Sequence, residues 1–474
     1  MHNAIKNDCK QTINVLMYMY VTNERRKRNM KAYKQGISLI VLVITVIVLS
    51  ILATTVIISL SNTNIISQTN SAVFKSDMAN LKSAYELYVA SELIKDVSFN
   101  VTTLNVTSSD AEFTKIFGDN VSEKYTAGLK IVDGKLVYDT DSPNELVVLI
   151  ELGMVEKPPI EIPEGFTMSV YAGERSIEDG LVIYKTDAKT LATYSQEEAQ
   201  KTFDQFVWVP VEYTKTNTDT DSNGTDDGFD AVFKRTDWSN NAPTGSIAAG
   251  YTEPYASGYS TEKAEYDAMR KSVEHYGGFY IGRYEAGDGD AKEARSTYTT
   301  GAHTVVLRKQ AYIYNYVGWG KNMKDVTSDV SSEKGKGAVY LSSNMYGTNA
   351  SYTTHLIYGV QWDATLKWLS DKYNVSDGRT WGNCSNSEGA AATNSGSGNM
   401  NYTTGRNEAW KAKNIYDLAG NVDEWTLEAV STSLRVVRSG TVNSSNCNAS
   451  SRGMYEPNIP DLNLGFRPVL YINL

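Results

Sequence analysis

A long apolar stretch, from Gly36 to Leu60, dominates the hydropathy pattern of the chain. No charged side chain occurs from Gln35 to Phe74, and about 20 apolar residues in a helix are enough to cross a bilayer. Six Lys and Arg residues lie just before the stretch, and no comparable cluster follows it. Because basic residues stay on the cytoplasmic side, we predict a cytoplasmic leader over residues 1–36 and a single transmembrane helix over residues 37–61. The rest of the chain is then expected to be extracellular.

Helical spacing continues after the predicted span. Apolar residues recur at steps of three or four between Asn62 and Asp96, which predicts an amphipathic helix. The Asp133-Gly134 pair lies between two alternating segments and predicts a β-hairpin with a type I′ turn. Ser142 and Gly153 flank a segment that starts with Pro, and this pattern predicts a short helix with an N-cap and a C-terminal stop.

These elements predict a small α+β module over residues 62–157. Three prolines then predict a stiff linker over residues 158–165, which leaves residues 166–474 as a separate domain. In that domain, the alternating segment Phe206–Pro210 predicts a buried strand. Apolar side chains from Trp362 to Tyr373 share one face of a predicted helix, so we expect them in the core.

The start of the apolar stretch carries a short motif. Residues 36–41, GISLIV, follow a short basic arm and resemble the N-terminal cleavage and methylation motif of type IV prepilins. The resemblance implies that a prepilin peptidase cuts between Gly36 and Ile37, and that pilin-like subunits are partners. Ile37 and Val41 stand where the family usually has Phe and Glu. In the family, that Glu is thought to pair inside the membrane with a neighbouring subunit. Because this chain lacks it, two alternatives remain: a filament subunit and a permanent single-pass anchor.

Five blocks of sequence occur in order in residues 166–474. They are Phe206–Pro210, Gly278–Glu285, Gly359–Asp363, Asn414–Thr426, and a closing block of Arg435–Gly440 with Gly465–Pro468. Together they resemble the formylglycine-generating (sulfatase-modifying factor) family, whose members share a C-type-lectin-like fold poor in regular secondary structure. The expected fold class is therefore α+β, with a transmembrane or pilin-like helix, the small module and a C-type-lectin-like domain. Within the blocks, we expect structural roles in packing and ion pairing for Trp425, Arg438 and Arg467.

The closing block lacks the cysteines that catalysis would need. Copper-dependent members of that family use two cysteines near the positions of Ser444 and Ala449, because soft thiolates select Cu(I). Cys447 alone cannot form a two-thiolate site. The four His residues show no close ligand spacing, and no nucleophile elbow, phosphate loop or HExxH motif occurs. We therefore expect no copper and a non-catalytic relative of the family, with a related enzyme as the less favoured alternative.

An acidic segment predicts a different metal. Oxygen-bearing side chains occupy loop positions 1, 3, 5, 9 and 12 around a glycine at position 6, a spacing that wraps a chain around Ca²⁺. The ligands would be Asp219, Asp221, Asn223, Asp227 and Asp230. In the resembled family, a second calcium can sit on the turn that matches Asn421 and Glu424. The alternative is a solvated acidic loop without a metal.

The segment Thr441–Leu464 is rich in Asn, Ser and Tyr. Such side chains supply adaptable hydrogen bonds and aromatic contacts on a rigid frame. The candidate ligand-binding residues are Asn443, Ser445, Asn446, Asn448, Tyr455 and Asn458. The segment also resembles the C-terminal region of the variable proteins of diversity-generating retroelements. Our hypothesis is a bacterial cell-surface protein, membrane-anchored or pilin-like, that displays a recognition domain for an extracellular ligand. A minor pilin or pseudopilin subunit is the alternative.

Composition narrows the partners further. The net charge is -10 and the pI about 5.2, with no basic cluster beyond the leader, so we do not expect a nucleic-acid partner. Of three cysteines, only Cys384 and Cys447 follow the predicted span. They can form a disulfide in an oxidising environment, but two separate thiols fit the sequence equally well.

Overall fold

The chain divides into two compact units, Met1–Tyr138 and Asp139–Leu474. The computed structural model describes residues 67–118, 121–155, 160–253, 260–293, 303–320, 337–387, 403–431, 433–445 and 447–474. The predicted leader and span, with the predicted cleavage point between Gly36 and Ile37, lie outside these residues. Within the described ranges, no helix combines the length and the apolar character that a membrane crossing needs.

The first unit is built on one long helix. Its described elements are α3 (Ser67–Lys95), η1 (Val101–Thr103), α4 (Ala111–Phe117), α5 (Glu123–Thr126), β1 (Leu129–Val132) and β2 (Lys135–Tyr138). Helix α3 confirms the predicted helix over its described part: it buries Phe74, Met78 and Tyr85, whereas Leu93, expected on the same apolar face, is exposed. The β1–β2 hairpin is also confirmed, because Asp133 and Gly134 have φ angles of 47° and 70°.

The boundary between the units lies earlier than the sequence predicts. Helix α6 (Pro143–Leu152) forms where expected, with Ser142 as N-cap and a left-handed Gly153 at its end. We assigned this helix to the module of residues 62–157. Leu146 of α6 is part of the hydrophobic core of the second unit, and Val147 and Ile150 pack against that core. Residues 156–159, which include the first two residues of the predicted linker, are outside the described residues.

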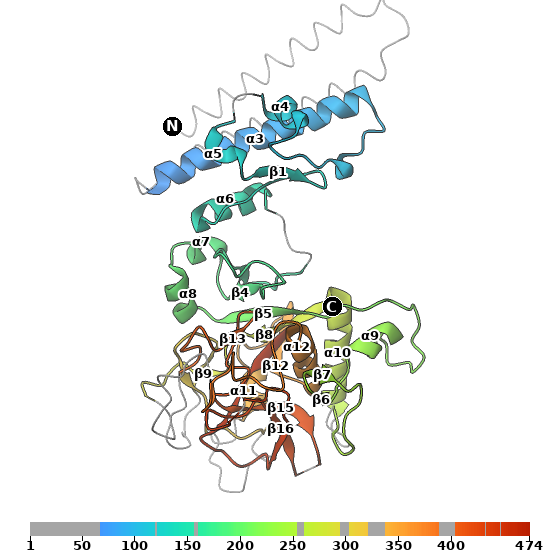
Figure 1. Ribbon diagram of the computed structural model, residues 1–474, viewed down its shortest axis with the longest axis vertical. Coiled ribbons are helices and arrows are strands. Elements are labelled where there is room, and N and C mark those ends of the chain that lie inside the picture. The colour runs from blue at the N-terminus through green and yellow to red at the C-terminus, as the bar shows by residue number, and fades with distance from the viewer. Residues whose placement is uncertain are drawn as a thin grey trace, which may run out of the picture. The chain divides into compact units, whose positions relative to one another are not determined.

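The second unit has a central antiparallel sheet of six strands in the order β12-β19-β8-β5-β4-β3 (Figure 1). Its other described helices are α7 (Ala188–Leu191), α8 (Gln196–Thr202), α9 (Asp227–Val232), α10 (Ser260–Tyr276), α11 (Ala338–Ser343) and α12 (Gly359–Leu369). The strands of the central sheet are β3 (Thr167–Met168), β4 (Val182–Tyr184), β5 (Gln205–Pro210), β8 (Gly278–Gly282), β12 (Tyr352–Leu356) and β19 (Pro468–Ile472). The predicted strand at residues 206–210 is thus confirmed as β5.

The two faces of this sheet bury different side chains. Because successive residues of a strand point to opposite faces, Val207 and Val209 of β5 pack with helices α10 and α12 in one cluster. Phe206 and Trp208 point into a second cluster on the other face. The predicted helix after Trp362 is confirmed as α12, whose Trp362, Leu366 and Leu369 are fully buried.

A second sheet of four strands lies in the C-terminal part, in the order β17-β16-β15-β18. Its strands are β15 (Asp423–Ala429), β16 (Arg435–Arg438), β17 (Gly453–Tyr455) and β18 (Leu464–Phe466), and β15 pairs with β18 in parallel. Short two-residue strands complete the second unit: β6 (Trp238–Ser239), β7 (Ala242–Pro243), β9 (Gly287–Asp288), β10 (Val305–Val306), β11 (Tyr312–Ile313), β13 (Lys411–Ala412) and β14 (Ile415–Tyr416). The fold class is mixed α+β, and the C-type-lectin-like topology stays a prediction.

Candidate functional site

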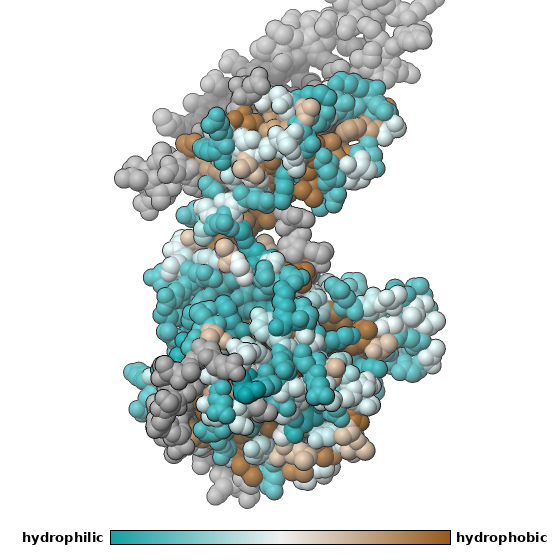
Figure 2. Space-filling model, viewed as in Figure 1, coloured by the Kyte–Doolittle hydropathy of each residue, from teal (hydrophilic) through white to brown (hydrophobic). Residues whose placement is uncertain are grey.

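The segment Thr441–Leu464, called the recognition segment from here on, presents polar and apolar side chains to solvent. Asn443 and Ser445 are exposed, and Asn458 is half-buried. Met454, Tyr455 and Ile459 are 51%, 36% and 43% exposed, although large apolar side chains are usually buried. Figure 2 shows hydrophobic areas at the lower end of the second unit, where Figure 1 places β15 and β16. The segment therefore offers a mixed surface that can make both hydrogen bonds and apolar contacts.

Not every candidate binding residue points outward. The Asn448 side chain is committed to its own backbone turn, because the Ser450 amide and hydroxyl both donate to its Oδ1, at 2.9 and 2.7 Å. Asn446 lies outside the described residues. Strand β17, which contains Tyr455, is at the edge of its sheet, and the Tyr455 ring meets Trp425 edge-on at 6.3 Å.

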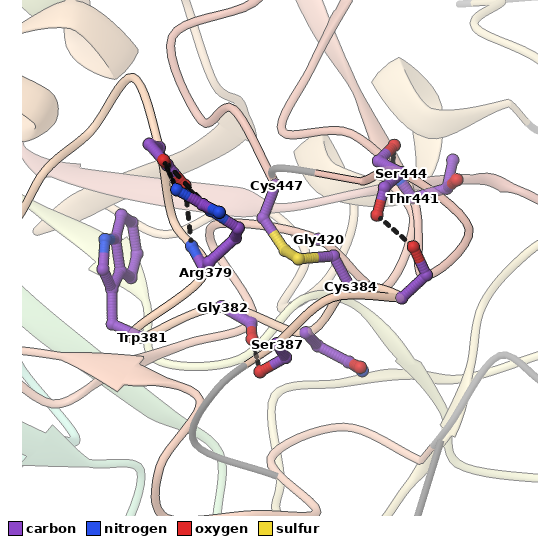
Figure 3. The surroundings of a disulfide bond; sticks show 12 residues. Arg379, Trp381, Gly382, Cys384, Ser387, Gly420, Thr441, Ser444 and Cys447 are labelled. Atoms are coloured by element: carbon purple, nitrogen blue, oxygen red, sulfur yellow. Dashed lines mark hydrogen bonds and ion pairs between the residues drawn. A yellow bond between two sulfur atoms is a disulfide. The ribbon is translucent and has the colours of Figure 1, made fainter. Parts of the chain in front are cut away.

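A disulfide ties the recognition segment to the chain that follows α12. Cys384 and Cys447 are joined and fully buried (Figure 3), which decides between the bonded and the separate thiols that the sequence left open. Close by, the backbone amide and the hydroxyl of Ser385 both donate to the Ser444 carbonyl, each at 3.0 Å. Since the Cys447 sulfur is bonded to another sulfur, it is not a thiolate that could ligate copper.

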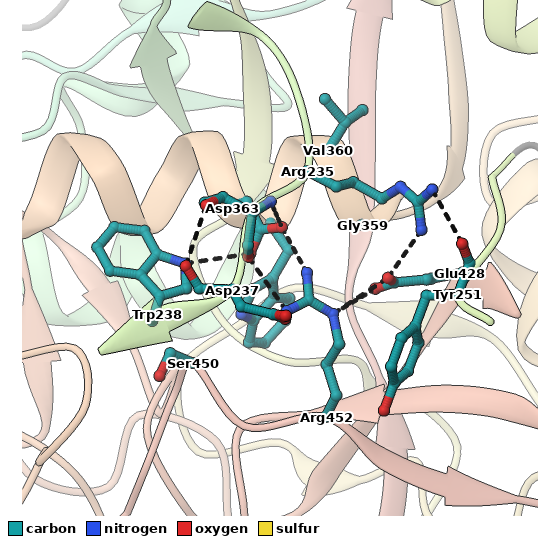
Figure 4. A network of polar contacts seen from close by, with 12 residues as sticks. Arg235, Asp237, Trp238, Tyr251, Gly359, Val360, Asp363, Glu428, Ser450 and Arg452 are labelled. Carbon is teal, nitrogen blue, oxygen red and sulfur yellow. Dashed lines mark hydrogen bonds and ion pairs between the residues drawn. The ribbon is translucent and has the colours of Figure 1, made fainter. Parts of the chain in front are cut away.

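Arg452 anchors the recognition segment to the protein interior through ion pairs with buried carboxylates (Figure 4). Its Nη2 donates to Asp363 at 2.6 Å, and its Nε donates to both oxygens of Glu428 at 3.1 Å. Asp363 and Glu428 are 1% and 0% exposed at the side chain, so these pairs are shielded from water. Removing one partner from such a buried network lowers the free energy of unfolding by about 3–5 kcal/mol.

Two further arginines share the same carboxylates. Arg438, also fully buried, donates to Asp363 at 2.9 Å and to the Ser451 carbonyl at 2.8 Å. Arg235 donates to Glu428 at 3.0 Å. Arg438 therefore makes a buried ion pair, as expected for a structural residue. Its hydrogen bond to the Ser451 carbonyl also holds the backbone of the recognition segment.

Glu253 was not singled out from the sequence, although it belongs to this network. Its carboxylate accepts from the backbone amides of Gly359 and Val360 and so caps the N-terminus of α12. Burial raises the pKa of Glu253 to about 7, and the Arg235 charge opposes that effect. No local motif announces such a cap, because 106 positions separate Glu253 from Gly359.

A second buried group of charges contains three residues that the sequence singled out. Arg467 Nε and Nη2 donate to Glu424 at 3.0 and 2.6 Å, and both side chains are fully buried. The Asn421 amide donates to Glu285. Asn421 and Glu424, expected to share a calcium ion, thus have separate partners, and the shared calcium stays a prediction. Trp425 is fully buried next to them in β15.

This second group holds more acids than bases. Burial raises the pKa of Glu285 well above its usual value, and it raises the pKa of Asp417 to about 7. Glu285 Oε2 and Asp417 Oδ1 have no hydrogen-bond partner among the described residues. Protonation is the way in which such crowded carboxyl groups avoid burying several negative charges together.

The predicted calcium loop brings together three of its five proposed ligands. Oxygens of Asp219, Asp221 and Asp227 lie within 4.8 Å of one another and could hold a metal ion. Asn223 links the cluster to Asp230: its side-chain amide donates to Asp221 at 3.0 Å and to Asp230 at 2.6 Å, and Asp230 also pairs with Arg270. Asp230, the residue expected at position 12, faces a competing cation, and the five-residue ligand set stays a prediction.

A second candidate metal group among the described residues was not foreseen from the sequence. Asp288, Asp290 and His303 could also hold a metal ion, with the His303 Nδ1 at 2.6 Å from Asp288. The only sequence signal is the spacing of two aspartates around Gly289, which is common in loops without a metal. Strand pairing of β9 with β10 brings His303 close, and the sequence alone does not show this pairing.

Comparisons with known proteins give little support for a family. No protein-family model matches the chain, and no curated protein matches it. Among solved structures, the chain is similar to Treponema denticola variable protein 1, with 16% identity and a TM-score of 0.20. The similarity covers 40% of this chain and 95% of that protein. At this TM-score the likeness carries no argument about fold or function.

Proposed function

We propose that the second unit is a non-catalytic recognition domain that binds its ligand through the recognition segment. The observation that carries the proposal is the contrast within this segment between exposed contact side chains and buried anchors. Asn443 and Tyr455 reach solvent, whereas Val442, Cys447 and Ala449 are buried. A backbone held in this way loses little conformational entropy when a ligand binds, which favours affinity.

The anchors also explain how the segment could vary without loss of the fold. Its disulfide, its Arg452 contacts and its buried apolar residues do not involve the exposed side chains of Asn443, Ser445 or Met454. Exposed substitutions away from such contacts usually change stability by less than about 0.5 kcal/mol. This separation supports the finer proposal that the segment is the variable region of a retroelement-diversified protein.

We further propose that the domain is displayed outside the cell on the apolar segment of residues 37–61. The disulfide supports this placement, because disulfides persist in oxidising compartments. Intact-mass and N-terminal sequencing of membrane-extracted protein test the mode of display. A chain that starts at Ile37 indicates prepilin processing and a filament or tip subunit, whereas a chain that keeps Lys34 indicates a permanent anchor.

A two-library experiment tests the recognition domain itself. The full-length protein is displayed on cells with Asn443, Ser445 and Tyr455 randomised, and a matched library randomises the buried Val442 and Ala449. We expect the first library to keep folded display and to yield binders to a purified probe such as biotinylated lysozyme. The second library should lose folded display, because its positions are in the core. Equal loss in both libraries would refute the proposal.

The retroelement version has its own test. Sequencing of the flanking DNA should find a reverse-transcriptase gene and a near-copy of the region that encodes the recognition segment. Without these neighbours the domain has a fixed ligand, and the finer proposal is wrong while the recognition role stands.

A further inference from the structure

Strand β17 of the recognition segment leaves one edge of its sheet open. It is the outermost strand of the sheet and pairs with β16 on one side only. Residues of an antiparallel strand alternate between bonding to the neighbouring strand and facing away from it. Within the described part of the chain, the backbones of Gly453, Met454 and Tyr455 make no hydrogen bond beyond the β16 pairing. The outer side of β17 therefore offers backbone donors and acceptors to another chain.

Exposed apolar side chains accompany this edge. Met454 and Tyr455 are exposed, and so is Ile459, whose amide closes the next turn on the Glu456 carbonyl at 3.2 Å. Because successive strand residues point to opposite faces, Met454 lies on the face opposite to Tyr455, whose ring meets Trp425. A strand added to β17 would cover apolar side chains on both faces of the sheet. Edge strands bind extended peptides in this way, with affinity from the main chain and specificity from alternate side chains.

The charge around the edge is negative. Glu456 is exposed, and Asp423 and Asp461 are half-buried. Burial raises the pKa of Tyr455, and the charges of Asp423 and Asp461 act in the same direction, so both carboxylates lie near its hydroxyl. Arg452, the single basic residue of the recognition segment, is committed to other, buried carboxylates. The edge therefore favours a partner that brings its own cations.

We propose that the ligand of the recognition segment is a protein, and that an extended stretch of basic and apolar residues in it adds to β17 as a further strand. The inference rests on the proposed recognition function and names the class of partner. Main-chain hydrogen bonds form along β17, apolar side chains cover Met454 and Tyr455, and a Lys or Arg faces Glu456. A second copy of this chain fits poorly, because it would bring the same acidic groups to the interface, and juxtaposed like charges are costly.

A random-peptide library tests the proposal. Phage that display peptides of about nine residues are selected on the full-length protein in nanodiscs of neutral lipid. The library is first depleted on the double variant Met454→Gln/Glu456→Lys, so that only peptides that need this edge remain. Both substituted side chains are exposed, and an unchanged Tm shows that the variant is folded. We expect edge-dependent peptides with apolar residues and a net positive charge. Their absence, or edge-dependent peptides without positive charge, overturns the proposal.

Backbone methylation tests the strand geometry. An enriched peptide is resynthesised with N-methyl groups on either its odd or its even residues, which removes the N–H donors on one side of an extended strand. Only one side of an added strand faces β17, so one series should lose at least about tenfold in affinity, and the other should stay within about threefold. Equal loss or equal retention in the two series overturns strand addition.

Single variants locate the binding and separate the two proposals. Glu456→Lys should weaken the binding of an enriched peptide by about threefold to tenfold, since an attraction becomes a repulsion. Glu212→Lys, at an exposed acid outside the recognition segment, should change it by less than about twofold, and equal effects overturn the assignment to this edge. If the library randomised at Asn443, Ser445 and Tyr455 yields lysozyme binders but no edge-dependent peptide exists, this inference is wrong and the recognition function stands. If neither experiment yields a binder, both are wrong.

Discussion

Removal of the Cys384–Cys447 disulfide should destabilise the second unit and release one anchor of the recognition segment. The bond joins residues 63 positions apart and closes a correspondingly long loop. In the chain-entropy model, such a cross-link removes about 14 cal/mol/K from the unfolded chain, or about 4 kcal/mol at 25 °C. The double variant Cys384→Ala/Cys447→Ala also loses two buried sulfur atoms, which adds about 1 kcal/mol for lost packing.

The size of the second unit converts this free energy into a melting shift. For a unit of roughly 340 residues, the entropy of unfolding is about 0.7 kcal/mol per degree. A loss of about 4–5 kcal/mol therefore lowers Tm by about 6–7 °C. Differential scanning fluorimetry of the full-length protein, with and without a reductant, measures the shift.

Two controls isolate the disulfide. The reductant should lower Tm of the unmodified chain and leave the double variant unchanged. Cys9→Ser changes the cysteine of the leader and should leave Tm unaltered. The reasoning is refuted if alkylation of the native, unreduced protein modifies Cys384 and Cys447, or if reduction leaves Tm where it was.

Three further predictions concern the buried and acidic groups. Arg452→Met removes one cation from its buried carboxylate partners and should lower the free energy of unfolding by about 3–5 kcal/mol, measured by urea titration. The control Lys263→Met, on the surface of α10, should leave the free energy of unfolding unchanged. Burial raises the folded pKa of Asp417 to about 7, so its contribution to stability falls as pH rises from about 4 to about 7. The stability of Asp417→Asn relative to the unmodified chain should therefore increase over that range, and a flat difference contradicts the assignment. Asp221→Asn should weaken Tb³⁺ or Ca²⁺ binding at the acidic loop, measured by Tb³⁺ luminescence. Asp230→Asn, outside the cluster of three aspartates, weakens the contacts of Asp230 to Arg270 and Asn223 and should leave metal binding unchanged.

Local elements were predictable because their signals lie next to each other in the sequence. Asp133-Gly134 is sufficient for the turn of the β1–β2 hairpin, since both positions need positive φ. Ser142 and Gly153 likewise mark the two ends of α6. The unit to which α6 belongs was not predictable, because it depends on the tertiary packing of residues such as Leu146.

The candidate site was predictable only in part. The composition of the recognition segment indicated an exposed surface, and the structure places Asn443, Ser445 and Tyr455 at the surface. Its supports could not be found in this way. Arg452 reaches Asp363 across 89 positions and Glu428 across 24, and no spacing rule links such residues. The pairing of Asp230 with Arg270 could not be foreseen for the same reason, because the two residues are 40 positions apart.

The placement of charge explains how one domain can combine a fixed frame with an adaptable surface. Buried ion pairs are sensitive to geometry, since a guanidinium that moves away leaves a carboxylate without a partner in a medium that solvates it poorly. Arg438 and Arg452 have this sensitivity: Arg438, outside the recognition segment, donates to the Ser451 carbonyl and to Asp363, and Arg452, within the segment, donates to the same Asp363. The exposed side chains above them make no such pairs, so their identity can change while the backbone beneath keeps its position. If this division is correct, affinity for a ligand should follow the exposed residues, and melting temperature should follow the buried arginines.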